Sequence, residues 1–471
     1  MHIIDKQFAY FSKDDILINI EGFTDQEIDE LVQRFGDRKN AEELLLQGFS
    51  SDIEKETALS SLLPISCGIN ITNACQLRCT YCSYSSGEAA EVTIRTKQLY
   101  RFIEFIFNNA RVREKLNIRK KLPRFYFAGG GEPTYDWSLF VAAVEYIKEL
   151  SQKHGIQYSL GLTSNFILNI SQVDYIVGNF NDILVSYDGI HDVQNKNRSG
   201  CQFNDSASIV ERNLSYLNSI NKARFSIRTT IWPEDYVSLR EMADNIYSNY
   251  HNVHSWAVEP VWELGRAKSN SIFTDSIHNI LDVNFVEAYN SLKKYTMDKY
   301  HRIAYTSIFK NGCCTYNCGA ILGQNPWLNA DGKVFSCLDA INSSAYIAEV
   351  DDDEIHFYRY FDKLNSEHLH YVREICSKCI ALPFCGGGCP LKHQRNADGE
   401  RMNISSFWDC SQKQQYWEIA LKTLINNGSY DNLCAKVIDT YKARNIYKIV
   451  GVPETNSIID GGKQNANKVL Y

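Results

Sequence analysis

The placement of fifteen cysteines constrains this 471-residue chain more than any other feature. Three cysteines lie within residues 75–82 and nine lie within residues 313–410, while the 230 residues between these groups hold only Cys201. Disulfide scaffolds are usually short and secreted, and residues 1–23 lack the apolar core and cleavage site of a signal peptide. We therefore expect two separate metal-binding regions in a cytoplasmic protein.

The composition excludes several other classes of protein. The chain is 44% hydrophobic and 22% charged, as in a soluble globular protein of two or three domains. No apolar run reaches the roughly 18 residues that a membrane-spanning helix needs. The formal net charge of −7 disfavours binding to nucleic acid or to an anionic membrane, so we expect neither partner.

Six apolar, β-rich runs, each followed by loop residues, predict a parallel α/β sheet. The runs are 68–72, 125–128, 158–163, 183–187, 225–231 and 256–261, with helical patterns at 97–107, 137–150 and 207–220 between some of them. An open barrel and a doubly wound sheet both fit this pattern. In either, the chemistry lies at the carboxyl ends of the strands.

Residues 1–62 predict a small leading α+β element. A weak strand pattern covers 16–20, and the Thr24-x-x-Glu27 capping box precedes a helical pattern that stops at Gly36. Two interpretations stay open for this extension, a peptide-recognition element and a packing element.

The first cysteine group, Cys75-x3-Cys79-x2-Cys82, suits an iron–sulfur cluster. Three thiolates can hold three irons of a four-iron cluster and leave the fourth iron open to a small molecule. The alternative, a zinc site, normally recruits a fourth ligand, but no histidine lies between His2 and His154.

This triplet, with Tyr81 before its third cysteine, resembles the signature of radical S-adenosylmethionine (SAM) enzymes. The resemblance implies a 4Fe–4S cluster and SAM as cofactors, with Gly130, Gly131 and Glu132 forming the glycine-rich loop that holds the SAM amino group. Residues 163–165 resemble the family's Thr-Asn-Gly stretch. The candidate cofactor-binding residues are Tyr81, Gly130, Gly131, Glu132, Ser164, Asn165, Ser186, Asp188, Arg198 and Arg228.

The segment around residues 186–198 resembles the fourth-strand segment of peptide-modifying members of the family. By that resemblance, Ser186 and Arg198 are candidates for the SAM carboxylate and ribose, and Arg228 on the fifth strand competes with Arg198. A guanidinium suits a carboxylate because its fork can donate two parallel hydrogen bonds.

The second cysteine group resembles the SPASM domain, which binds two auxiliary iron–sulfur clusters. When the ligand positions of that domain are carried over to this sequence, one 4Fe–4S cluster uses Cys318, Cys337, Cys389 and either Cys313 or Cys314. The other cluster uses Cys376, Cys379, Cys385 and Cys410. Taken alone, residues 376–389 also suit a zinc ribbon.

The resemblance implies a peptide-modifying enzyme. A reduced cluster would cleave SAM to a 5′-deoxyadenosyl radical that abstracts hydrogen from a peptide or protein, often a ribosomal precursor, with flavodoxin or ferredoxin as electron donor. The main alternative is an anaerobic sulfatase-maturating enzyme that makes formylglycine. In that branch an Asp directly follows the cysteine of the Gly-x4-Cys element, whereas here Leu338 intervenes and Asp339 is the candidate base. A non-enzymatic zinc scaffold is the third hypothesis.

The predicted fold class is therefore α/β. We expect a partial (β/α)6 radical SAM barrel at 63–300, followed by a small cysteine-rich SPASM domain at 301–426. An N-terminal extension at 1–62 and a C-terminal extension at 427–471 complete the expected organisation.

Overall fold

The computed structural model describes residues 2–4, 8–11, 16–19, 63–115, 122–200, 205–220, 224–261, 265–269, 278–306, 325–341 and 346–357. The chain divides into two compact units, Met1–Lys310 with Leu322–Tyr360 and Asn311–Ile321 with Phe361–Tyr471, and every described residue belongs to the first. Several predictions lie outside the described residues: the helix after Thr24, and Cys313, Cys314, Cys318, Cys376, Cys379, Cys385, Cys389 and Cys410.

Six parallel strands form the central sheet, and each overlaps one of the six predicted runs. They are β4 (Ser66–Ile69), β5 (Arg124–Phe127), β6 (Ser159–Ser164), β7 (Asp182–Ser186), β8 (Phe225–Ile231) and β9 (Val253–Pro260). Their order in the sheet follows their order in the chain. A doubly wound sheet reverses its strand order at one point, so the uninterrupted order identifies the open-barrel alternative.

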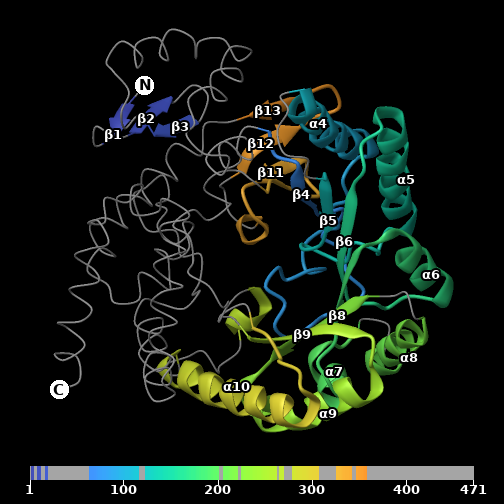
Figure 1. Cartoon of the computed structure of the whole chain (residues 1–471), viewed down its shortest axis with the longest axis vertical. Coiled ribbons are helices and arrows are strands. Elements are labelled where there is room, and N and C mark those ends of the chain that lie inside the picture. The colour runs from blue at the N-terminus through green and yellow to red at the C-terminus, as the bar shows by residue number, and fades with distance from the viewer. Residues whose placement is uncertain are drawn as a thin grey trace. The chain divides into compact units, whose positions relative to one another are not determined.

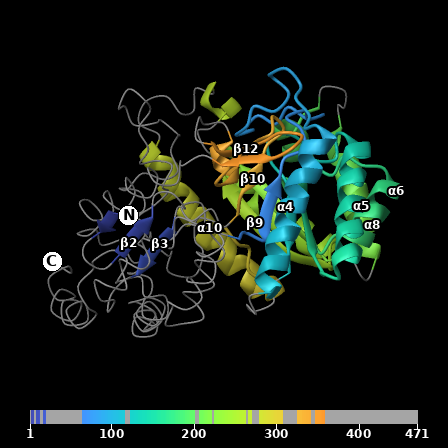
Figure 2. The same ribbon diagram turned by 90° about the horizontal axis from the view of Figure 1, so that it is seen from above.

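Helices line one side of this sheet (Figures 1 and 2). They are α4 (Thr96–Lys115), α5 (Trp137–His154), α6 (Ile170–Asn179), α7 (His191–Asn197), α8 (Ser206–Ser219), α9 (Leu239–Asn249) and α10 (His278–Tyr300). Local sequence sets their ends: Asp136 caps the start of α5, Gly155 in a left-handed conformation ends it, and Asn169 with Gln172 forms a capping box on α6.

The two faces of the sheet differ in burial because side chains alternate along each strand. One face, which includes Phe125, Leu162 and Val185, is fully buried in the core. The opposite face, which we call the inner face, includes Tyr126, Thr163, Ser186 and Arg228, whose side chains are half-buried or exposed. The apolar core therefore lies mainly on one side of the sheet, and the inner face combines polar side chains with partly buried Leu184 and Ala257.

Four further strands extend the sheet beyond β4. Strand β10 (Trp327–Leu328) pairs in parallel with β4, and β11 (Lys333–Phe335), β12 (Tyr346–Val350) and β13 (Ile355–Phe357) follow as antiparallel neighbours. The sequence placed these residues in the SPASM region, 301–426, yet they share one sheet with the barrel strands. Gln98 of α4 reinforces the link, because its Nε2 donates to the Val350 carbonyl at 2.6 Å.

Near the N-terminus, β1 (His2–Ile4), β2 (Phe8–Phe11) and β3 (Ile16–Asn19) form an antiparallel sheet in that order. This confirms the strand predicted at 16–20. None of the helices in the described part of the chain combines the length and apolarity needed to cross a membrane.

Candidate active site at the carboxyl ends of the strands

The three cysteines of the first group lie on the loop between β4 and α4, at the carboxyl end of β4. Asn73 anchors this loop, because its Nδ2 donates to Ala90 O at 2.9 Å and its Oδ1 accepts from Val92 N at 2.7 Å. Cys75, Cys79 and Cys82 are unpaired and only partly buried. The loop therefore presents three thiols within eight residues.

Hydrogen bonds converge on two of these sulfur atoms. Leu77 N and Asn165 Nδ2 approach Cys75 Sγ at 3.4 and 3.6 Å, and Ser86 N approaches Cys82 Sγ at 3.5 Å. Such donors to sulfur tune iron–sulfur clusters. Burial raises the pKa of both Cys75 and Cys79, the latter to about 11, while Arg198 acts in the opposite direction on Cys79.

The donor set is the one that a four-iron cluster with one open iron requires. Three free thiols on one eight-residue loop can hold three irons of such a cluster, whereas a structural zinc site takes four protein ligands. The residues present thus fit the four-iron cluster that the triplet implies.

The glycine-rich loop after β5 lies directly against the cysteine loop. A Cβ on Gly131 would come within 2.3 Å of Ala74 O and 2.5 Å of Thr72 O, so glycine is required for this approach. Glu132 N donates to Ala74 O at 2.9 Å, and Ser86 Oγ donates to Gly130 O at 2.6 Å. Two loops far apart in sequence are thereby joined.

The Glu132 carboxylate is buried and is held by hydrogen bonds from neighbouring groups. It accepts from Asn165 N at 2.8 Å and from Thr134 Oγ1 at 2.7 Å, and thus joins the ends of β5 and β6. Burial raises the pKa of Glu132, and these hydrogen bonds act in the opposite direction. Asn165 in turn contacts the Cys75 sulfur.

Phe166 directly follows the stretch at 163–165 that resembles the family's Thr-Asn-Gly. Its φ of 61° lies in the left-handed region that favours glycine.

Tyr81, Asp188 and Arg198 form a buried polar group beside the cysteine loop. Asp188 accepts from Tyr81 OH and, at 3.1 Å, from Arg198 Nε, and the Arg198 guanidinium lies 5.3 Å from the centre of the Tyr81 ring. Thr230 N also donates to Asp188, at 3.2 Å. The charge of Arg198 is thus compensated within the protein.

Arg228 differs, because its side chain is exposed on the inner face. It is the register partner of Ser186. Because Ser164 pairs with Val185, the next residue, Asn165, lies level with Ser186 across the sheet. Within the described ranges, no carboxylate lies close enough to Arg228 for an ion pair. Of the two arginines that the sequence left open, the structure leaves Arg228 available to an anion.

Asp339 reaches the same region from the far end of the described chain. It lies in η5 (Leu338–Ala340), and Leu338 packs against Gly129, where an added Cβ would meet Leu338 Cδ1. Asp339 is accessible to solvent, but the surrounding protein reduces its hydration and raises its pKa, while Arg228 acts in the opposite direction. Asp339 and Cys337 also raise the pKa of half-buried Tyr84, although burial contributes most to that shift.

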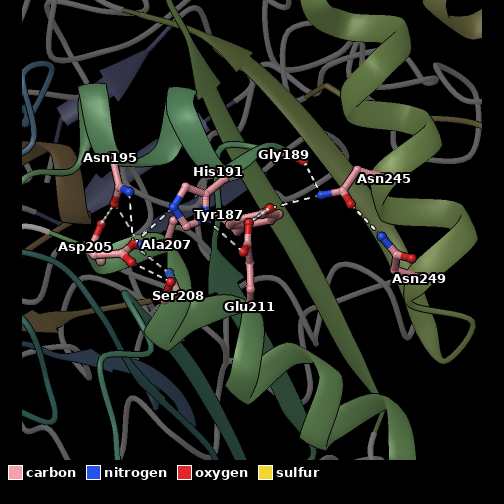
Figure 3. A network of polar contacts seen from close by, with 11 residues as sticks. Tyr187, Gly189, His191, Asn195, Asp205, Ala207, Ser208, Glu211, Asn245 and Asn249 are labelled. Atoms are coloured by element: carbon pink, nitrogen blue, oxygen red, sulfur yellow. Dashed lines mark hydrogen bonds and ion pairs between the residues drawn. The ribbon is translucent and has the colours of Figure 1, made fainter.

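Figure 3 shows a polar network that links Tyr187, His191 and Glu211. Glu211 accepts from Tyr187 OH at 2.7 Å and contacts His191 Nδ1 at 3.1 Å, while His191 Nε2 lies 3.3 Å from Asp205. Tyr187 precedes Asp188 and His191 begins α7, so Glu211 holds both ends of the turn that contains Asp188.

Two arginines at the cysteine loop were missed from the sequence. Arg78 donates to Cys75 O at 2.6 Å and to Gly87 O at 2.9 Å, and Arg266 donates to Cys79 O at 2.6 Å. Arg266 lies in η2 (Gly265–Ser269), which follows the last parallel strand. The only sequence signal for Arg266 was its position after the end of a strand. Loops at strand ends favour polar residues in any case.

Comparisons with known proteins agree with this arrangement. A family model described as the radical SAM superfamily matches residues 69–246. His-tagged anSMEcpe with bound AdoMet is similar in structure, with a TM-score of 0.57, 20% identity and coverage of 79% of this chain and 98% of that chain.

Two further structures contain a bound peptide. Native anSMEcpe with AdoMet and the Cp18Cys peptide gives a TM-score of 0.56 at 20% identity, covering 78% of this chain and 99% of that one. Streptococcus suis SuiB bound to precursor peptide SuiA gives 0.50 at 13% identity, covering 86% and 100%. At such identities these likenesses establish the fold alone. No curated protein matches the sequence.

Proposed function

Because residues 69–246 form a radical SAM domain, we propose that this chain cleaves SAM reductively and modifies a side chain of a peptide or protein. The observation that carries the proposal is the three-cysteine loop at the carboxyl end of β4, held against the Gly129–Glu132 loop. When bound, the cluster and SAM supply a 5′-deoxyadenosyl radical, which abstracts hydrogen from an unactivated carbon.

The residues of the chain bind and orient the reactants. Cys75, Cys79 and Cys82 would hold the cluster, and the close approach at Gly131 leaves backbone groups next to it for the SAM amino group. Ser186 and Arg228, which are register partners on the inner face, would hold the SAM carboxylate.

A polypeptide substrate is the reading with most support. Two of the similar structures, anSMEcpe and SuiB, contain bound peptides. The inner face of this sheet is polar and partly exposed, which suits a substrate that must reach the strand ends. Strand β3 pairs with β2 on one side, and its other edge, which has no partner among the described strands, offers a place for strand addition.

The SPASM-type cysteines belong to the same proposal. Cys337 is the described member of that set, and it directly precedes the η5 turn that contacts Gly129. Auxiliary clusters at those cysteines would accept the electron that remains on the substrate radical. A small reducing protein such as flavodoxin or ferredoxin would supply the electron for SAM cleavage.

The test is an anaerobic assay. The full chain is reconstituted with iron and sulfide, mixed with dithionite and SAM, and analysed for 5′-deoxyadenosine. Wild type should form it, and a Cys75→Ala/Cys79→Ala/Cys82→Ala variant should not. Cys67→Ala is the matched control, because Cys67 is buried within β4 and belongs to neither cysteine pattern. Zinc instead of iron in the purified protein would favour the scaffold hypothesis.

Formylglycine formation is the second candidate, and the position of Asp339 favours it. Asp339 is accessible and lies within electrostatic reach of Arg228 on the inner face, where a base can meet a substrate side chain. Incubation with a Cys- or Ser-containing sulfatase-type peptide would decide. A product aldehyde supports this reading, and unchanged peptide alongside SAM cleavage points to another modification.

A further inference from the structure

Arg266 contacts the cysteine loop through most of its donors. Its Nη1 donates to Cys79 O at 2.6 Å, its Nη2 to Ser86 O at 3.0 Å, and its backbone N to Cys82 O at 3.0 Å. Its Nε pairs with Glu88. One residue, 187 positions from Cys79, thus binds carbonyl groups on both sides of Cys82.

The backbone next to Arg266 is fitted to the same loop. Gly265 has a φ of +51°, and a Cβ there would lie 2.3 Å from Cys82 O and 2.5 Å from Ser83 O. Ala267 is fully buried in a cluster with Tyr81 and Trp232, against which Cys79 also packs. Residues 265–267 therefore dock on the loop through contacts on three successive residues.

Further hydrogen bonds join the rest of the loop to other segments of the domain. Arg78 N donates to Ser199 O at 2.6 Å, Thr80 N donates to Asn197 O at 2.8 Å, and Trp232 Nε1 donates to Thr80 Oγ1 at 2.9 Å. These contacts fix the backbone on which the cysteines stand, so the direction of each Cα–Cβ bond is set by the protein.

We propose that Arg266 is a positioning residue that holds the Cys79–Ser86 segment ready for the cluster and slows the loss of iron from it. The inference rests on the proposed function, since it takes the Cys75–Cys82 loop as the cluster site. The physical reason is geometric. A planar guanidinium spans two carbonyl groups at once, whereas an ammonium group acts as a single point charge.

The first test needs no variant. In the full wild-type chain before reconstitution, hydrogen exchange should be slow at the amides of Arg78, Thr80 and Arg266, which donate to Ser199, Asn197 and Cys82. Exchange at the rate of an unstructured loop would overturn the proposal.

The second test compares iron release to a chelator from the reconstituted full chain. Arg266→Gln and Arg266→Lys should both lose the loop's iron faster than wild type, by about 10- to 100-fold if the whole loss of metal affinity that follows removal of such supporting residues falls on the release rate. Iron held elsewhere should leave at the wild-type rate. Arg124→Gln, which removes an exposed guanidinium paired with Asp182 at the other end of the sheet, should match wild type.

Each outcome decides the matter. If Arg266→Lys retains iron as wild type does, charge rather than the fork acts and the proposal is wrong; release of all iron at one faster rate would show general unfolding instead. If Arg266→Gln fails to fold, Gly265→Ala is the second variant. Its added Cβ would collide with Cys82 O and displace residues 265–267 from the loop, so it should release iron faster than wild type. A wild type that binds no iron contradicts the proposed function. Hydrogen exchange at the amides of Arg78, Thr80 and Arg266 then still tests whether the loop is held in place.

Discussion

Gly131 illustrates how closely two loops approach at the site. Gly131→Ala would bring a Cβ to 2.3 Å from Ala74 O and force the loops apart, at a cost of about 1–3 kcal/mol. We expect SAM affinity to fall by roughly tenfold or more, measured by equilibrium binding to the reconstituted protein. Gly178→Ala is the control, because nothing lies within 4 Å of its Cβ position. Equal SAM affinity in the two variants would contradict this view of the loop.

Asp188 carries the second prediction at the scale of single residues. Asp188→Asn leaves the Arg198 charge buried without its carboxylate and should destabilise the fold by about 3–5 kcal/mol in urea unfolding of the full chain. Asp182→Asn breaks the exposed pair with Arg124 and should cost less than about 1 kcal/mol. Similar losses in both variants would show that Asp188→Asn does not leave the Arg198 charge buried and uncompensated.

The choice between Arg198 and Arg228 shows what residue type alone cannot decide. Both arginines suit a carboxylate equally well in the sequence. Only folding pairs Arg198 with Asp188 and leaves Arg228 exposed next to Ser186. Asp339 was likewise found by its proximity in sequence to Cys337, but its approach to the inner face depends on the packing of Leu338 on Gly129.

Helix α7 offers a prediction at the scale of elements, because its first residue is the titratable His191. The hydrogen bond with Glu211 raises the pKa of His191, Asp205 and Asp192 act in the same direction, and burial opposes them. A raised pKa means that the contribution to stability is complete below about pH 6.5, the value in the unfolded chain, and is lost as the pH rises through the folded value.

The expected effect is small, because the His191 side chain is 44% exposed. His191→Gln should lower the unfolding temperature by about 1–3 °C at pH 5.5 and by less at pH 8.5. Thermal unfolding of both proteins at the two pH values measures this, and a difference that does not change with pH would contradict the ionic role of His191.

The parallel strands and the helices between them were predictable because their signal is local. Apolar residues at strand or helix spacing recur within short windows, and each of the six strands overlaps its predicted run, although β4 begins two residues earlier and ends three residues earlier than the run at 68–72. The return of β10–β13 to the sheet was not predictable, since β10 pairs with β4 across more than 250 residues. The left-handed backbone conformation of Phe166 was also not predictable, because its residue type gives no sign of it.

Iron content provides the prediction for the whole molecule. One cluster at residues 75–82 and two at the later cysteines would give about 12 iron atoms per reconstituted chain, and the triple cysteine-to-alanine variant should lose about four. Iron and sulfide analysis measures both values. If the variant kept the full iron content, the first cysteine group would not bind a cluster.

The sequence by itself determined the class of the fold and the candidate ligands of the site. Three cysteines within eight residues and periodic apolar runs are local properties of the chain. The tertiary structure decided which distant side chains meet the candidate site. Arg266 meets Cys79 from 187 residues away, and Arg198 pairs with buried Asp188 while Arg228 is exposed beside Ser186. These contacts depend on how distant segments pack, and no pattern in a short window of sequence carries that information.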